Sequence, residues 1–286
     1  MHKVEKMNIK HNLKTLLFAF FPVIAALSSI VVLSSFRNHT SIEMPTDFTY
    51  RKMVNNAFTY GEKLNYRVHY GFINAANIEM EVYGSVEEVY EHKTFHIRAE
   101  GKTIKTFDWA YKVRDKFDTY IDQDALCPIK FTKTVREDNY YDTDLVAFKH
   151  EKKKLFGSKG VLDMPEYTQD VISALYYART LDLAKAKKGD TYPIDVYLDN
   201  KIYNLKFKYD GKETIKTDIG SVKCYKLLPA LIVDRVFKNE NDMTIWISED
   251  DNKIPIRIKA DIAVGSIKVD ITKYSGLKSS FTSLKN

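Results

Sequence analysis

The histidines and the acidic residues are the side chains of this sequence that could hold a metal ion or carry acid-base chemistry. His92 and His96 stand four residues apart, a spacing that would place both on one face of a helix. The residues around them alternate between apolar and polar, which predicts a turn and a strand instead. We therefore expect both histidines to lie solvated on a strand face, and we predict no metal site.

Acidic residues gather in two clusters, and carboxylate oxygens are the ligands of calcium sites. The clusters consist of Asp115, Asp118, Asp122 and Asp124, and of Glu137, Asp138, Asp142 and Asp144. Neither has the glycine and the terminal glutamate of an EF-hand loop, so charged turns between strands explain them. A carboxylate pair that hydrolyses a polymer would meet only in the folded protein, which leaves a hydrolase as one hypothesis.

The two cysteines, Cys127 and Cys224, could form a disulfide or remain separate thiols. A disulfide would close a loop of about 100 residues and stabilise the fold by about 4–5 kcal/mol. A sheet protein of this size does not need the bridge, so we expect two unpaired thiols.

The sequence contains no CxxC pair and none of the motifs GxSxG, HExxH, GxGxxG or GxxxxGK. These absences favour a non-catalytic protein without a cofactor.

The N-terminus has the layout of an export signal. Four lysines precede an uncharged stretch over residues 15–36 that is apolar for most of its length. This pattern predicts either a signal peptide over residues 1–35 or an uncleaved anchor over residues 15–36. In both cases the rest of the chain lies outside the cytoplasm, and any membrane contact is made through this segment.

The net charge of the exported part is small. The first 35 residues hold four lysines and one glutamate, so the net charge of the remainder falls from +6 to +3. A balance this close to zero argues against nucleic acid as a partner.

Strand patterns cover most of the remaining sequence. Leu64, Tyr66 and Val68 alternate with polar residues, and the same period of two recurs up to Ile271. The 19 tyrosines and 16 phenylalanines, against 11 glycines, also suit pleated sheets. We predict a tether over residues 36–57, a single β-rich domain over 58–274 and a flexible tail over 275–286.

One segment has helical periodicity instead. Val171, Ile172, Leu175 and Tyr176 form an apolar stripe, with Thr168 as a candidate N-cap. We predict a helix over residues 168–186. The fold class is therefore mainly β, a large antiparallel curved sheet that forms a half-barrel or open barrel, with one substantial α-helix.

If the barrel encloses a cavity, its mouth should lie between this helix and the sheet. Tyr176 would then pack inward and Tyr177 would lie toward the rim. Arg179 either meets an anionic group of a ligand at the mouth or pairs with an acid such as Asp170 or a strand carboxylate. The candidate ligand-binding residues are Tyr176, Tyr177, Arg179 and Trp246.

Four groups of segments together resemble a known family. They are Phe58–Tyr66; Tyr120–Asp122 with Leu126–Pro128; Gln169–Tyr177 with Arg179; and Ile245–Asp250 with Ile254–Arg257 and Val264–Ser266. They are similar to an exported family of Gram-negative bacteria that is known only as a domain of unknown function. The resemblance implies a periplasmic location and a large antiparallel sheet, without an assigned activity. More distantly, the closing tryptophan strand and the long curved sheet together resemble the periplasmic lipoprotein-carrier fold, a half-barrel with a helical lid.

Three hypotheses for function follow. Aromatic-rich alternation, export and the absence of catalytic motifs favour a cell-envelope protein that binds a lipid or another apolar molecule. The alternative is an envelope assembly or scaffolding protein that acts through protein–protein contacts. The third is a hydrolase of an envelope polymer.

Overall fold

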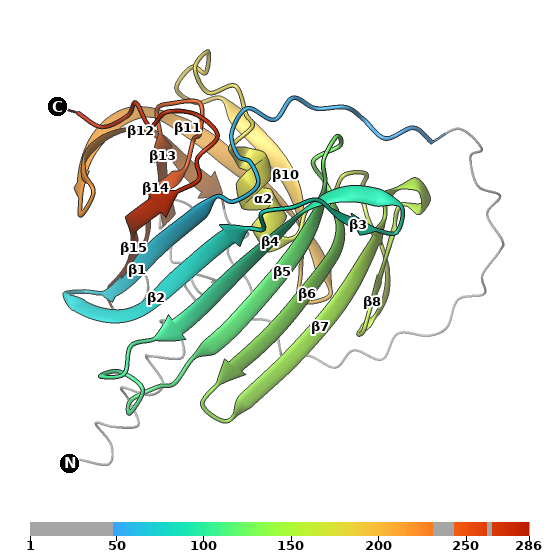
Figure 1. Ribbon diagram of the computed structural model, residues 1–286, viewed down its shortest axis with the longest axis horizontal. Helices are drawn as coiled ribbons and strands as arrows, with labels where there is room; N and C mark the ends of the chain where they lie inside the picture. Colours follow the sequence, from blue (N-terminus) through green and yellow to red (C-terminus); the bar gives the residue numbers. More distant parts are fainter. Residues whose placement is uncertain (1–47, 231–242, 262–264, 286) are drawn as a thin grey trace.

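The computed structural model describes residues 48–230, 243–261 and 265–285, which form one curved antiparallel sheet (Figure 1). The strands are β1 (Lys63–Tyr70), β2 (Ile73–Val82), β3 (Glu87–Val89), β4 (His92–Thr103), β5 (Arg114–Asp122), β6 (Pro128–Glu137), β7 (Tyr140–Lys149), β8 (Lys154–Gly157), β9 (Gly160–Asp163), β10 (Thr191–Leu198), β11 (Lys201–Thr217), β12 (Gly220–Ala230), β13 (Met243–Ser248), β14 (Pro255–Asp261) and β15 (Ser266–Ser275). The helices are the 3₁₀-helix η1 (His150–Lys152) and the α-helix α2 (Val171–Ala178).

The sheet is open and does not close into a barrel. Its strand order is β10-β11-β12-β13-β14-β15-β1-β2-β4-β5-β6-β7-β8-β9, and β3 pairs with β4. Strands β15 and β1 are neighbours although they come from opposite ends of the domain. The predicted fold class is thus confirmed as a mainly β protein with one large antiparallel sheet and, within the described residues, one α-helix.

The alternation in the sequence sets the two faces of the sheet. Leu64, Tyr66 and Val68 are buried in β1, and the polar residues between them are only partly buried. The turn between β10 and β11 is the expected one, because Asp199 and Asn200 both have positive φ, as a two-residue hairpin turn requires.

The helix is shorter than the predicted range of 168–186. Asp170, not Thr168, is its N-cap: the Asp170 carboxylate accepts hydrogen bonds from the backbone of Ile172 and Ser173, both at 2.8 Å. Residue Gln169 cannot be helical because its backbone pairs with β10, through its N–H to Asp195 and its carbonyl to Tyr197. A tertiary contact therefore moves the start of the helix.

Helix α2 lies on the concave side of the sheet and separates two hydrophobic clusters (Figure 1). Ile172 and Tyr176 pack into the larger cluster, which includes buried residues of β1, β2, β4–β7, β14 and β15, as the predicted apolar stripe requires. Ala174 and Ala178 belong to the cluster formed by β10–β13. The helix thus fills the upper part of the concave side.

The chain on either side of the domain also contacts it. Tyr50 and Met53 lie within the predicted tether, yet Tyr50 bonds to Glu151 and the Met53 backbone to residue 124. Within the predicted flexible tail over residues 275–286, the Ser283 carbonyl accepts a backbone hydrogen bond from Lys223 of β12, and the Lys285 N–H donates to the carbonyl of Ser221. The leader and residues 36–47 of the predicted tether lie outside the described residues.

Both cysteines are free thiols, as expected, and both are buried. Burial raises the pKa of Cys224 to about 12 and that of Cys127 further above its usual value. Among the residues that the structure describes, no helix has the length and hydropathy of a membrane-crossing segment.

Candidate functional site

Buried charged residues appear on one side of the concave face, among apolar residues such as Phe131 and Val146, and the other side is apolar. The register aligns Leu64, Met80, Ala99, Phe117, Lys133 and Asp144 in a single row across β1, β2, β4, β5, β6 and β7. All six side chains are buried. The first four are apolar and the last two are charged, so the change falls between β5 and β6 in this row.

Two further rows lie nearer the connection between β1 and β2, and the second of them again ends in an acidic residue. One row contains Ile258, Val269, Val68, Ala76 and Thr103, and the next contains Ile271, Tyr66, Ile78, Gly101 and Asp115. We call the part on β14, β15, β1, β2 and β4 the apolar half, and the part on β5–β7 that begins with Asp115 the charged half. The small residues Ala76, Ala99 and Gly101 lie on the central strands β2 and β4.

Lys133 is the central cation of the charged half. Its side chain is only 4% exposed and its ammonium group lies 2.8 Å from Asp142 and 2.5 Å from Asp199. Burial opposes the charge on Asp142, but hydrogen bonds from Lys133 and Lys159 outweigh it and lower the pKa of that carboxyl. At Asp199 burial prevails and the pKa is raised.

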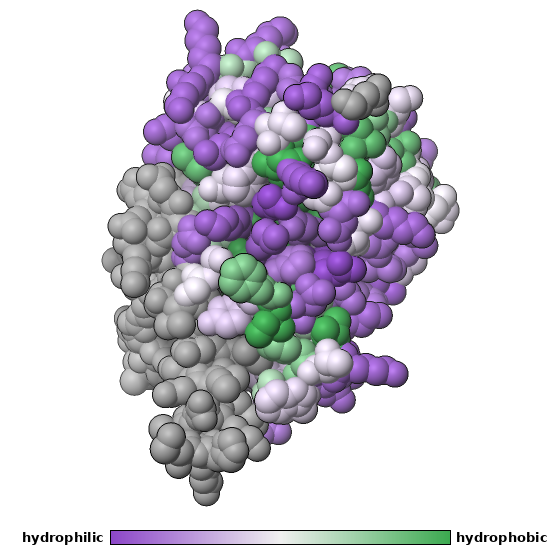
Figure 2. Space-filling view, turned by 90° about the vertical axis from the view of Figure 1, so that its left-hand side faces the viewer, coloured by the Kyte–Doolittle hydropathy of each residue, from purple (hydrophilic) through white to green (hydrophobic). Residues whose placement is uncertain are grey.

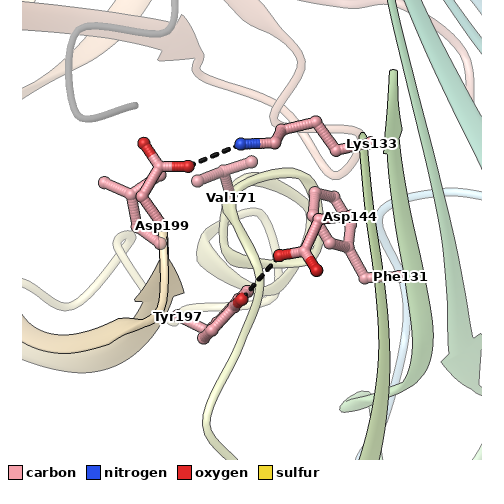
Figure 3. Close-up of a pocket in the computed structure, with 7 residues that line it drawn as sticks. Phe131, Lys133, Asp144, Val171, Tyr197 and Asp199 are labelled. Atoms are coloured by element: carbon pink, nitrogen blue, oxygen red, sulfur yellow. Dashed lines mark hydrogen bonds and ion pairs between the residues drawn. The ribbon is translucent and has the colours of Figure 1, made fainter. Parts of the chain in front are cut away.

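Contacts of these charged side chains connect β10, at one end of the sheet order, with β6 and β7 near the other end (Figure 3). The Tyr197 hydroxyl of β10 donates to Asp144 of β7 at 2.6 Å, and Asp199, just after β10, pairs with Lys133 of β6. We call these two contacts the seam. The pocket beside them, which Phe131 and Val171 also line, has room for about one water molecule. The seam therefore holds β10 against β6 and β7, and its pocket is too small for a lipid.

Arg179 forms a buried ion pair with a carboxylate, one of its two predicted roles. Its guanidinium donates to both carboxylate oxygens of Glu62, at 2.6 and 2.7 Å, and to the carbonyls of Ala57 and Asn252. Burial acts to lower the pKa of Arg179, but Glu62 outweighs it and the pKa is raised. The side chain is 1% exposed, so it ties the helix to the start of β1 and does not lie at a mouth.

The other three predicted residues do not gather around one cavity. Tyr176 is buried against Phe58 and Arg179, with its ring 4.9 Å from the Arg179 guanidinium carbon. Tyr177 is partly buried on a different side of the helix, where Arg51 lies over its ring. Trp246 is buried in β13 and its indole N–H donates to Glu213 at 3.0 Å.

The sequence interpretation of the histidines was wrong for His96, which is 5% exposed. Its ring stacks between Tyr83 and Tyr120, 4.3 Å from each, and its two nitrogens contact Glu87 and Asp118. Two tyrosines from adjacent strands cover the ring, which single-strand alternation could not indicate. The described residues contain no cluster of three or more histidine, cysteine or acidic side chains placed to hold a metal ion.

Sequence reasoning missed a buried carboxyl pair in the charged half. Asp115 and Glu137 hydrogen-bond to each other, and the Tyr111 hydroxyl donates to Glu137 at 2.7 Å. Burial raises the pKa of Asp115 to about 7, although the backbone N–H of Arg136 opposes the shift. Glycosidase carboxylates stand about 5–9.5 Å apart on either side of a substrate, so this directly bonded, buried pair does not have that geometry.

A second missed feature lies at the lower end of the sheet in Figure 1. Phe72, Ile73, Trp109, Tyr140 and Tyr141 are exposed there, at or beside the connections between strands. Apolar residues also gather in the lower part of the face seen in Figure 2, whereas its upper part is mainly hydrophilic. The signal in the sequence was an aromatic residue next to a turn, as in Gly71-Phe72.

Residues 65–272 match a family whose description is protein of unknown function, DUF3108. The match covers well over half of the chain. The chain belongs to the DUF3108 family. This confirms the resemblance to a domain of unknown function that the four groups of segments indicated. No curated protein matches the chain of this DUF3108 protein.

Solved structures resemble the DUF3108 chain in fold. A β-barrel-like protein of the domain of unknown function DUF1849 from Brucella abortus is 14% identical with a TM-score of 0.52, over 76% of this chain and 97% of that one. A lipoprotein candidate from Parabacteroides distasonis is 10% identical with a TM-score of 0.33, over 79% and 100% of the two chains. A candidate exported protein from Bacteroides fragilis is 9% identical with a TM-score of 0.34, also over 79% and 100%. The first likeness shows a shared barrel-like fold.

Proposed function

We propose that this DUF3108 protein is an exported envelope protein that binds a lipid or another apolar molecule and catalyses no reaction. The observation that carries the proposal is the apolar half of the concave face. The residues of its rows on β14, β15, β1, β2 and β4 are all uncharged. Export rests on the predicted leader over residues 1–35.

The apolar half has dimensions that suit an acyl chain. Five neighbouring strands about 4.8 Å apart give a width of about 19 Å. Each CH₂ group that leaves water for such a surface contributes about 0.8 kcal/mol. The side chains of the rows are mostly buried, but the face continues to Phe72 and Ile73, which are exposed at the lower end of β1 and β2. A ligand reaches the apolar half from that end, since α2 fills the upper part.

The test is mass spectrometry of lipids extracted from the purified full chain, with an unrelated exported protein purified in parallel. A lipid in near-stoichiometric amount is the expected result. Two matched variants locate it: Val68→Thr adds a hydroxyl to the apolar half, and Val146→Thr adds the same group to the charged half. Only Val68→Thr should lower the amount of lipid that co-purifies with the protein. Absence of lipid from the wild-type protein, or equal loss in both variants, would contradict the proposal.

Protein–protein contact is the second candidate, and the edge strand β9 favours it. This four-residue strand ends the sheet beyond β8, and Val161 on β9 and Phe156 on β8 are 54% and 42% exposed. An exposed edge with apolar side chains can accept a strand from another chain. A photo-crosslinker at position 161 should then capture one discrete protein in the envelope, while one at exposed Val54 should not.

A further inference from the structure

Three connections between strands lie together at the lower end of the sheet. They are the β1–β2 turn at residues 71–72, the β4–β5 loop at 104–113 and the β6–β7 turn at 138–139. Antiparallel pairing requires this, because every second connection along a meander falls at the same end. Figure 1 shows all three along the lower left edge of the sheet. We call this group of connections the tip end.

Each connection exposes large apolar side chains. Phe72 and Ile73 are 104% and 55% exposed, Trp109 is 71% exposed, and Tyr140 and Tyr141 are 47% and 61% exposed. Of the five side chains, Tyr141 has a cation–π contact, with the Arg136 guanidinium carbon 5.5 Å from the centre of its ring. An exposed tryptophan with phenylalanine and tyrosines on neighbouring turns is the composition of side chains that anchor proteins at a membrane–water interface.

Cations surround these side chains. Lys102, Lys105, Lys112 and Arg136 are exposed, and none forms an ion pair with another residue of the described ranges. Two acids on the same connections do not cancel these four cations. Asp108 pairs with Arg114 at 2.7 Å, and Asp138 is exposed and accepts a hydrogen bond from the backbone N–H of Lys112. The tip end therefore carries an excess of positive charge, which is complementary to anionic lipid headgroups.

The arrangement fits a bilayer better than a protein partner. The apolar side chains stand on three separate connections with cations between them, whereas a stable protein interface buries about 800 Å² per partner with charge depleted from its centre. A bilayer surface accepts separate anchors at headgroup level and binds the cations between them.

We propose that the tip end docks on the surface of an anionic bilayer, with Phe72, Trp109 and Tyr141 inserted at headgroup level. This rests on the proposed lipid binding and deepens it, since the docked end is the one where the apolar half of the concave face reaches the surface. Lys105 and Lys112 contact lipid phosphates.

The test uses Trp109 as its own reporter. The full chain is mixed with phosphatidylcholine vesicles, with and without phosphatidylglycerol, and brominated acyl chains quench tryptophans that enter the bilayer. Quenching is expected with phosphatidylglycerol and should disappear in Trp109→Phe, because Trp246 is buried. The double variant Lys105→Glu/Lys112→Glu should weaken binding to these vesicles about tenfold or more. Added salt should weaken binding of the wild-type protein.

Matched control variants, which all carry the leader, separate docking at the tip end from nonspecific binding to vesicles and from binding through the leader. Phe72→Ser should weaken the quenching, and Val54→Ser, an equally polar change at another exposed apolar residue, should not. Absence of Trp109 quenching, equal quenching on both vesicle types, or equal effects of the two serine variants would overturn the proposal. Lipid extraction reports on the bound ligand separately, so a protein that holds lipid yet fails to dock contradicts only the docking.

Discussion

At the scale of single residues, buried charged side chains connect segments that lie far apart in the sequence. The Arg179–Glu62 pair joins residues 117 apart, and both side chains are almost completely buried. A buried ion pair adds little over a well-packed apolar pair, but loss of one partner leaves an uncompensated charge. The pair therefore specifies how α2 meets the start of β1.

Arg179→Met should lower the free energy of unfolding by about 3–5 kcal/mol, because Glu62 would remain buried without a partner. Urea unfolding followed by circular dichroism measures this. The double variant Arg179→Met/Glu62→Leu removes both charges and should recover part of the loss. A single variant as stable as the wild type would show that the pair does not constrain the fold.

The Asp115–Glu137 pair should make stability depend on pH. The pKa of Asp115 is about 7 in the folded protein against an ordinary value of 3.8, so the folded state holds the proton more tightly. Stability from this group is fully present below about pH 4 and is lost as the pH rises toward 7. Asp115→Asn should flatten this decline, measured as the free energy of unfolding at several pH values between 4 and 8. If the free energy of unfolding falls with pH as steeply in Asp115→Asn as in the wild-type protein, other groups cause the fall.

At the scale of elements, α2 depends on a cap that is also a tertiary contact. Asp170 caps the helix and also accepts a hydrogen bond from Thr119 of β5 at 2.5 Å. Burial raises its pKa to about 6, which the hydrogen bonds from Thr119 and the helix N-terminus oppose. One side chain thus fixes both where the helix begins and where it sits on the sheet.

Asp170→Ala should destabilise the protein by about 2 kcal/mol or more, since it removes a cap and a buried hydrogen bond together. Ser173→Ala removes the reciprocal bond of the capping box and the longer bond from the Ser173 hydroxyl to the Asp170 carbonyl, and should cost about 1 kcal/mol or less. Thermal unfolding of both variants gives the comparison. Equal losses would indicate that the Thr119 contact contributes nothing.

At the scale of the whole molecule, the open sheet is held in its curve by the seam. Tyr197 and Asp199 belong to the end of the sheet that starts with β10, and Asp144 and Lys133 belong to β7 and β6 near the other end. Side chains, not a backbone ladder, connect these strands. The curvature therefore responds to changes in a few polar contacts.

Tyr197→Phe should cost about 1–3 kcal/mol because Asp144 loses a buried hydrogen-bond donor. It should also speed amide exchange in β10 more than in β1, which lies far from the seam in the sheet order. Hydrogen exchange with mass spectrometry resolves the two strands. Uniform acceleration across the sheet would mean that the bond supports global stability and does not hold the seam.

The strands, the fold class and the lack of a cysteine bridge could be inferred from the sequence by itself. Period-two alternation is a local property, so Leu64, Tyr66 and Val68 indicate a half-buried strand whatever lies beside it. The tertiary structure alone decided what the strands bring together. The N-cap at Asp170 follows from the pairing of Gln169 with β10, and the choice of Glu62 for Arg179 follows from a contact between distant segments. The apolar and charged halves, the Asp115–Glu137 pair and the tip end depend on register, which a sequence without its strand pairing does not specify, because a shift of one residue turns every side chain to the other face.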